Sequence, residues 1–292
     1  MFTASPHRHL IGFDGKVRID ELSTSPPKSA PSKEEAKIRL EALKVRLAEL
    51  QDILWAFDSR ALLVIFQAMD AAGKDSTIRA VLSGVNPIGC EVHSFKAPNA
   101  AEVDQDFLWR SAQVLPSRGK IGVFNRSYYE EVLVVRVHPE YLERQRIPEL
   151  PKLKRLWEER YESIRDHELH LARNGTVVVK LWLNVSKKTQ KKRFLKRLDE
   201  PEKNWKFSSA DVAERAHFDA YMAAYEEALA ETSRPHAPWY AIPADDKAYM
   251  QLTVAEILVE TLERMGLKYP EVKSEERARF DEIRALLQAE DD

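Results

Sequence analysis

Cysteine is nearly absent from the chain, because Cys90 is the only one among 292 residues. A single cysteine excludes an internal disulfide framework and a zinc site built from several cysteines. No apolar run approaches the roughly 18 residues that a membrane-spanning helix requires. Residues 1–16 lack the unbroken apolar segment of a secretory signal. From these absences we expect a protein of the reducing cytoplasm that has no membrane partner.

The chain also lacks a global excess of either charge. Its formal net charge is −2, so the overall charge does not indicate a nucleic-acid partner, and we expect none. The distribution is nevertheless uneven, since nine Lys or Arg face three acidic residues between Lys187 and Lys206, a local net charge of +6. A solvated helix face is the ordinary explanation of such a run. A polyanionic ligand is the alternative.

Apolar runs alternate with helical patterns along most of the chain. The run ALLVIFQ (61–67) is continuous, as expected for a strand buried on both faces of a parallel sheet. We predict further strands at 90–95, 120–125, 176–184 and 239–242. The predicted helices lie at about 74–84, 100–114, 127–137, 150–172, 186–198, 211–232, 246–266 and 274–289. This alternation predicts an α/β fold with a central parallel sheet and helices on both faces.

The domain organisation follows from composition. Residues 1–31 are irregular and rich in Ser and Pro, and we interpret them as an N-terminal arm; residues 32–268 form one domain, and 269–292 a charged C-terminal helix or tail. The spacing of Ser32 and Glu35 indicates a capping box that opens a long helix. Its leucine stripe either packs on the rest of the protein or serves a subunit contact. We expect a homo-oligomer, a dimer or a tetramer.

A candidate phosphate-binding turn follows the first strand, in the segment QAMDAAGKDST (67–77). A small-residue turn before a helix presents backbone N–H groups and the positive end of the helix dipole to an anion. The sequence keeps Gly73 and Lys74 of the pattern G-x-x-x-x-G-K-[ST] but has Ala68 at the first glycine and Asp75 in place of Ser or Thr. An ordinary turn with an exposed lysine is the weaker interpretation.

Two carboxylates, Asp70 and Asp75, flank the place where phosphates would lie. Carboxylates repel phosphates unless a cation lies between them, and Mg²⁺ is the natural mediator. Asp75 is equally explained as a favourable charge in the first turn of a helix. That explanation is weaker for Asp70, which precedes the helix.

A second polar cluster follows the strand predicted at 120–125, where Asn125, Arg126, Ser127, Tyr129 and Glu130 appear abruptly. Ligands of open α/β sheets bind at the carboxyl ends of central strands. Arg126 could neutralise charge on a transferring phosphoryl group. Alternatively, Asn125 or Ser127 caps a helix, which explains one residue of the cluster and not the others.

Long stretches of the chain resemble the polyphosphate kinase 2 family. The resemblance is carried by FQAMDAAGKDSTIRAVLSGVNPIGCEVHSFKAP (66–98) and FNRSYYEEVLVVRVH (124–138), and also by RFLKRLDEPEKNWKFSSAD (193–211) and APWYAIPADDK (237–247). It extends from about residue 35 to 268. The resemblance implies a P-loop kinase fold of the thymidylate-kinase type, with three layers and a helical lid at about 187–210.

The resemblance also implies roles for individual residues. Asp70, Lys74 and Asp75 correspond to the Walker A loop and, with Arg126, are the predicted catalytic residues. Asn125, Arg126 and Ser127 correspond to the Walker B strand end. Asp70 is the predicted metal ligand, with Glu130 a weaker candidate, and the metal is Mg²⁺ or alternatively Mn²⁺. The predicted binding residues are Ala72, Gly73, Ser76, Asn125, Ser127, Tyr129, Glu130, Arg193, Arg197, Asp199, Lys203 and Lys206.

The activity implied is reversible phosphoryl transfer between inorganic polyphosphate and nucleotides, with ADP or AMP as acceptors and ATP as a product or donor. Transfer would be in line, without a covalent enzyme intermediate. Asp199 to Pro201 would serve as a lid hinge or an acceptor contact. One alternative is an ATP-dependent nucleoside or nucleotide kinase, which has less need of the basic run. Another is a non-catalytic protein that binds polyanions or nucleotides, which has no need of Asp70 and Asp75.

Overall fold

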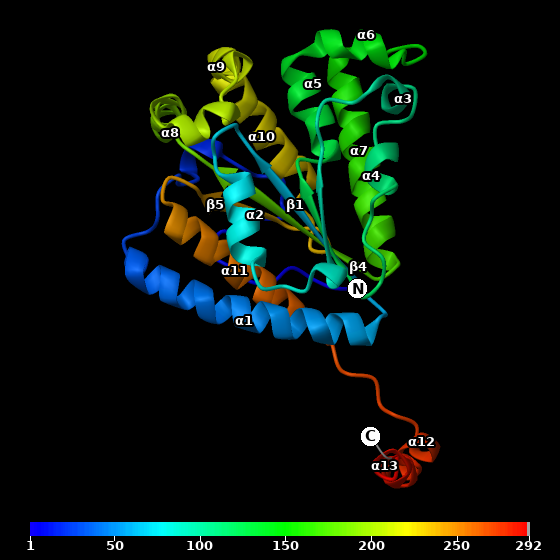
Figure 1. Cartoon of the computed structure of the whole chain (residues 1–292). Coiled ribbons are helices and arrows are strands. Elements are labelled where there is room, and N and C mark those ends of the chain that lie inside the picture. The colour runs from blue at the N-terminus through cyan, green and yellow to red at the C-terminus, as the bar shows by residue number, and fades with distance from the viewer. Residues whose placement is uncertain (291–292) are drawn as a thin grey trace.

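The computed structural model describes residues 1–290, except for the side chain of Lys206. Its centre is a five-stranded sheet in the order β2-β3-β1-β4-β5, and every neighbouring pair is parallel. The strands are β1 (Ala61–Ala68), β2 (Cys90–Ser94), β3 (Ile121–Asn125), β4 (Thr176–Asn184) and β5 (Trp239–Pro243). Figure 1 shows helices on both faces of this sheet. The predicted α/β fold with a parallel sheet is confirmed.

The helices form two layers, one against each face (Figure 1). In one layer α1 (Lys33–Phe57), α2 (Lys74–Leu82) and α11 (Lys247–Arg264) contact one another; in the other, α10 (Phe218–Thr232) contacts α5 (Val134–Val137) and α7 (Leu153–Arg173). The central strand between them is mainly apolar, since six of the eight β1 residues are hydrophobic and almost fully buried. A central parallel strand has no solvated face, which explains its continuous apolar sequence.

The sheet places functional groups at one edge. The chain visits β2 and β3 on one side of β1 and then crosses to β4 and β5 on the other side. Strand order therefore reverses around β1, and the crevice beyond the carboxyl ends of such strands is where open α/β sheets bind ligands. Asp70 follows β1 and Arg126 follows β3, so both lie at this edge.

Helix α1 begins with the predicted capping box. The N–H of Glu35 donates to Ser32 Oγ over 3.2 Å, and the N–H of Ser32 donates to Glu35 Oε2 over 2.8 Å. The buried leucines of the predicted stripe include Leu40, Leu47 and Leu54, and the helix packs on α11. The opposite side of α1 is left to solvent.

Several predicted helices are wrong in extent because local side chains interrupt them. The helix predicted at 100–114 is divided into α3 (Ala100–Val103) and α4 (Trp109–Ala112). Asp106 accepts the N–H of Leu108 over 2.9 Å, a local bond that competes with helical pairing. The remaining divided segments are η3 (Tyr128–Val132) with α5, α9 (Ser209–Glu214) with η6 (Arg215–His217) and α10, and α12 (Ser274–Ala278) with α13 (Phe280–Gln288).

Residues 1–31 pack along the β5 edge of the sheet and contain one short helix, η1 (Ile19–Glu21). Leu10 forms an antiparallel bridge with Tyr240, and the N–H of Ile11 donates to the carbonyl of Trp239 over 2.9 Å. These bonds use backbone groups that would otherwise be unpaired on an edge strand. At the other end of the chain, α12 and α13 project away from the body (Figure 1).

Five further elements complete the chain. They are η2 (Pro87–Gly89), η4 (Pro139–Tyr141), α6 (Leu142–Gln145) and the pair α8 (Lys187–Asp199) with η5 (Pro201–Lys206). Within residues 1–290 the chain has no helix that combines the length and apolar character needed to span a bilayer.

Candidate active site

A cavity of about 620 Å³ opens at the carboxyl ends of β1, β2 and β3, beneath α8 and η5. It brings together residues from five segments of the sequence: 70–76, 94–97, 125–126, 193–203 and Lys247. The predicted site residues that line it are Asp70, Ala72, Gly73, Lys74, Asp75, Ser76, Asn125, Arg126, Arg193, Arg197 and Lys203. Lys96, Lys196 and Lys247 add further positive charge to the lining, so the cavity favours an anionic ligand with several charges.

The turn between β1 and α2 has the backbone of a phosphate loop. Ala71 and Gly73 have φ angles of 60° and 108°, and the N–H of Ala72 donates to the carbonyl of Met69 over 3.2 Å. A φ of 108° is readily available only to glycine, and a Cβ on Gly73 would meet Met250 Cε at 3.2 Å. Gly73 therefore lets the chain turn tightly into α2. The first residues of this helix line the cavity, and the free N–H groups of a helix lie at that end.

Lys74 is the first residue of α2, and its side chain folds back over the loop. Its Nζ donates to the carbonyl of Ala68 over 2.9 Å, and only 8% of the residue is exposed. Burial lowers the pKa of Lys74, whereas the carboxylate of Asp70 raises it. The ammonium group is thus held within the loop, where it can stabilise charge on a phosphoryl group.

Arg126 joins the two strand ends electrostatically. Its Nη2 donates to Asp70 Oδ1 over 2.9 Å, and its Nη1 lies 3.5 Å from Glu130 Oε2. Glu130 and Asp70 both raise the pKa of Arg126, so the guanidinium is a permanent cation. Its φ of 64° is uncommon for a side chain of this size, and it is consistent with a functional site.

Gln67 supports this arrangement from beneath and was not predicted as a site residue. Its Nε2 donates to Glu130 Oε1 over 3.0 Å, and the residue is fully buried. Gln67 is the only strongly polar residue of the run ALLVIFQ. A lone amide in a buried strand needs a partner, and this was the available sequence signal.

Asn125 and Asp75 contact each other across the cavity floor. Asn125 Nδ2 donates to Asp75 Oδ1 over 2.8 Å and lies 3.4 Å from Ser94 Oγ. The carboxylate of Asp75 is therefore tied to the end of β3 in addition to lying in the first turn of α2. Ser76, one residue later, donates its hydroxyl to the carbonyl of Gly73 over 2.9 Å.

The carboxylates fit a metal that arrives with a phosphate. Among residues 1–290 no three His, Cys, Asp or Glu side chains gather as a metal cage. Mg²⁺ is commonly held by one or two carboxylates together with substrate phosphates and water. Asp70 has a partly exposed side chain that lines the cavity, and its carboxylate oxygens are hard donors suited to this ion.

The cationic side chains above the loop come from α8 and η5. Arg197 Nη1 lies 3.3 Å from Asp211 Oδ2, Lys196 lies 3.1 Å from Glu200, and Lys203 pairs with Glu200 as well. Asp211, in α9, was missed from the sequence. Burial and then the charge of Asp70 raise its pKa. The predicted hinge coincides with the end of α8 at Asp199.

Some predicted residues lie elsewhere. Tyr129 is fully buried, and its hydroxyl donates to Glu168 Oε1 over 2.8 Å. Ser127 is also buried, and its hydroxyl accepts the N–H of Tyr129, so it serves as the cap that was the alternative interpretation. Asp199 and Glu130 are not among the lining residues, although Glu130 holds Arg126 from behind. The side chain of Lys206 lies outside the described part of the structure.

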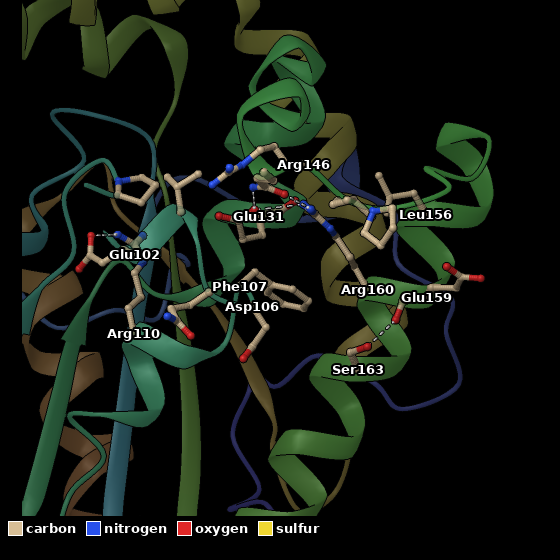
Figure 2. Close-up of a pocket in the computed structure, with 16 residues that line it drawn as sticks. Glu102, Asp106, Phe107, Arg110, Glu131, Arg146, Leu156, Glu159, Arg160 and Ser163 are labelled. Carbon is tan, nitrogen blue, oxygen red and sulfur yellow. Dashed lines mark hydrogen bonds and ion pairs between the residues drawn. The ribbon is translucent and has the colours of Figure 1, made fainter. Parts of the chain in front are cut away.

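A second cavity, of about 320 Å³, adjoins the first. Ala97 lines the first cavity, and the next residue, Pro98, lines the second. Figure 2 shows Phe107, Arg146 and Arg160 among its walls. Arg160 lies over the ring of Phe107 at 5.3 Å and donates to Glu131 Oε2 over 3.1 Å and to Gln145 Oε1 over 2.5 Å. The sequence does not predict this cavity, because its walls come from four separate segments.

The parallel sheet, the phosphate loop after β1 and the arginine after β3 together define a P-loop kinase fold. The family model described as polyphosphate kinase 2 (PPK2) matches residues 30–270. The chain belongs to the polyphosphate kinase 2 family, as the sequence resemblance indicated.

Individual relatives agree with this assignment. The chain is 51% identical over 278 residues to an ADP-polyphosphate phosphotransferase of Rhodopseudomonas palustris, covering 95% of this chain and 96% of that protein. It is 45% identical to an AMP/ADP-polyphosphate phosphotransferase of Meiothermus ruber, covering 90% and 95%. The crystal structure of polyphosphate kinase 2 from Arthrobacter aurescens TC1 superimposes with a TM-score of 0.85 at 38% identity, covering 97% and 98%.

Proposed function

We propose that this protein transfers phosphoryl groups between inorganic polyphosphate and nucleotides, reversibly, with ADP or AMP as acceptors. The observation that carries the proposal is the cavity, which combines a phosphate loop, an arginine anchored by two carboxylates and several further cations. A chain polyanion gains affinity from many such cations at once. The names of the Rhodopseudomonas and Meiothermus relatives support ADP and AMP as acceptors.

We propose a task for each side chain of the cavity. The loop amides and Lys74 hold the terminal phosphoryl group of polyphosphate, and Arg126 neutralises charge on its equatorial oxygens. A terminal phosphate oxygen of the nucleotide attacks the phosphorus in line. A new P–O bond forms to the nucleotide, the P–O bond to the chain breaks, and the chain leaves one residue shorter. ADP thereby becomes ATP, and AMP becomes ADP.

Asp70 would hold Mg²⁺, or alternatively Mn²⁺, with Glu130 as a weaker candidate. When bound, the ion shields phosphate oxygens from the carboxylates and stabilises charge on them. The protein's own part is to keep the carboxylate in place, and Arg126 does so through the 2.9 Å contact with Asp70. Asp75 contributes a second carboxylate that Asn125 fixes toward the cavity.

The second cavity is suited to the nucleoside part of the acceptor. It adjoins the first at Ala97 and Pro98, and the ring of Phe107 and the guanidinium of Arg110 offer planar surfaces for a base. Arg160 is fully engaged by Glu131 and Gln145 (Figure 2). Apolar atoms make up most of the exposed lining of this cavity, as is typical of small-molecule sites.

The test is to incubate the purified protein with Mg²⁺, long-chain polyphosphate and either ADP or AMP, and to separate the nucleotides by chromatography. We expect ATP from ADP, or ADP from AMP, only when polyphosphate is present. A parallel reaction supplies ATP with a nucleoside or AMP and no polyphosphate. Transfer confined to that reaction would identify an ATP-dependent kinase, and binding without turnover in any reaction would identify a non-catalytic protein.

Two further proposals concern the setting of the reaction. We propose a homo-oligomer, a dimer or a tetramer, because Ile38 and Val45 on the outer side of α1 are 71% and 64% exposed. Light scattering of the full chain tests this, and a monomeric mass at micromolar concentration contradicts it.

We also propose a cytoplasmic location, supported by the single cysteine and by the nucleotide substrates.

A further inference from the structure

Two side chains of α8 hold the phosphate loop through its backbone carbonyls. Gln190 Nε2 donates to the carbonyl of Asp70 over 3.0 Å. Arg193 Nη1 donates to the carbonyls of Ala71 and Ala72 over 3.1 and 2.5 Å. Three consecutive loop carbonyls are therefore bound by one helix, although 120 residues of sequence separate Gln190 from Asp70.

The trans geometry of the peptide bond turns these contacts into a constraint on the loop amides. In a planar trans peptide the carbonyl of one residue and the N–H of the next point in opposite directions. Fixing the carbonyls of Asp70 and Ala72 toward α8 therefore fixes the N–H groups of Ala71 and Gly73 toward the opposite side of the loop. Backbone N–H groups of such a loop are the donors that bind phosphate.

The guanidinium of Arg193 is occupied on its other side as well. Its Nη2 donates to the carbonyls of Ala244 and Asp245 over 2.6 and 3.4 Å, at the start of the segment leading to α11. Asp245 in turn accepts the N–H of Ser186, the cap of α8, over 2.9 Å. Arg193 thus joins the phosphate loop, α8 and the end of β5, and both terminal nitrogens donate to backbone carbonyls.

Gln190 is anchored in the same way. The residue is 1% exposed, and its Oε1 accepts Arg215 Nη1 over 2.6 Å, while the same nitrogen lies 3.1 Å from the carbonyl of Lys187. Buried amides with both ends bonded are stiff because an unmade bond would cost the desolvation energy of the group. The first half of α8 therefore moves with the loop as one body.

We propose that Gln190 and Arg193 are positioning residues, which hold the phosphate loop so that its amides face the transferring phosphate. Arg193 then acts through the loop and is not one of the lid cations that contact polyphosphate. Arg193 lines the cavity together with Lys196, Arg197 and Lys203, but its two terminal nitrogens already donate to backbone carbonyls. Any closure of the lid takes place beyond Arg193, toward the end of α8 at Asp199.

The first test compares Arg193→Lys and Gln190→Leu with wild type by hydrogen exchange of the segment 69–76 without substrate. Lysine keeps the charge but cannot donate to two carbonyl pairs at once. Lys192→Ala is the matched control, because Lys192 is exposed on the same helix. We expect the loop amides to exchange faster than in wild type in Arg193→Lys and Gln190→Leu. In the control they should exchange at the wild-type rate. Unchanged exchange in both variants would overturn the proposal.

The second test uses steady-state kinetics and rests on the proposed function. A loop displaced by about 1 Å costs on the order of 100-fold in rate, so kcat should fall steeply while KM for polyphosphate and its salt dependence stay near wild type. A raised KM with a flatter salt dependence, and kcat retained, would show that Arg193 contacts polyphosphate and would overturn the proposal. Absence of transfer by the wild-type protein would instead refute the proposed function, whereas the exchange experiment would still decide the role of Arg193.

Discussion

The Nη2 atom of Arg126 lies 2.9 Å from Oδ1 of Asp70. The two residues are 56 positions apart, and they meet because parallel strands bring their carboxyl ends to one edge of the sheet. Each has a second role in the proposed transfer: Arg126 would contact phosphate oxygens directly, and Asp70 would act on them through a metal ion. Their mutual contact holds a partly exposed carboxylate beside a permanent cation before the substrates bind.

Replacing Asp70 by Asn should weaken the metal dependence of the reaction. The amide keeps the shape of the side chain but loses the charge, so we expect the half-saturating Mg²⁺ concentration to rise by about 10- to 100-fold. The measurement is initial rate against Mg²⁺ at fixed polyphosphate and ADP. Asp52→Asn, on the exposed side of α1, is the control. If the titration curves of Asp70→Asn and wild type superimpose, Asp75 or Glu130 becomes the better metal ligand.

Lys74→Met should remove nearly all turnover without unfolding the protein. Methionine retains most of the buried stem, and it lacks the ammonium group that stabilises charge on the transferring phosphoryl group. The loss of one such group costs about 100- to 1,000-fold in kcat. Thermal melting measured in parallel should show a folded protein. Activity within a few-fold of wild type would remove Lys74 from the phosphate site.

Neutralising Lys196 and Lys203 together should weaken polyphosphate binding more than nucleotide binding. Both line the cavity, and a chain polyanion contacts several such charges, whereas one nucleotide engages mainly the loop. Binding of polyphosphate releases fewer counterions when a lysine contact is lost. The slope of log KM against log salt concentration should therefore fall by roughly one unit per lysine. The control pair is Lys188→Ala with Lys192→Ala, exposed on the same helix. Equal weakening toward both substrates would indicate general damage to the lid.

Lys180→Met should destabilise the core. Lys180 Nζ lies 2.6 Å from Glu168 Oε2, and both side chains are fully buried. Burial lowers the pKa of Lys180 to about 8, although Glu168 raises it. Removing one partner of a buried pair leaves an unpaired charge and costs about 3 to 5 kcal/mol, whereas replacing both by apolar residues is nearly neutral. Urea unfolding of Lys180→Met and of the double variant with Glu168→Leu measures this; equal stabilities of the two variants would contradict it.

The sequence was informative where chemistry follows strand ends. Asp70 and Lys74 were predicted from the phosphate-loop turn after an apolar strand, and Arg126 because polar residues begin abruptly after another; the sheet brings those positions together. Tyr129 was placed in the same cluster by adjacency alone. In the structure its hydroxyl contacts Glu168 and Lys180, and a buried pair formed by distant residues leaves no local pattern.

The residues around the lid were harder to predict for a related reason. Gln190 and Arg193 lie within a basic run that resembles a solvated helix face, and nothing local distinguishes a residue that holds backbone carbonyls from one that contacts ligand. Asp211 and the second cavity depend on how α7, α9 and the loop after β2 pack together. The ends of some helices also differ from the predicted ones. There, local side-chain hydrogen bonds, such as the one that Asp106 accepts from the N–H of Leu108, outweigh helical propensity.

The central claim is that one terminal phosphoryl group passes from polyphosphate to the nucleotide bound in this cavity. ³¹P NMR of wild-type protein with polyphosphate, ADP and Mg²⁺ follows donor and product together. The account predicts that each ATP formed is matched by one phosphate residue lost from the chain, without accumulation of inorganic phosphate, and that Lys74→Met shows neither change. Release of inorganic phosphate without ATP, or ATP formation undiminished in Lys74→Met, would contradict it.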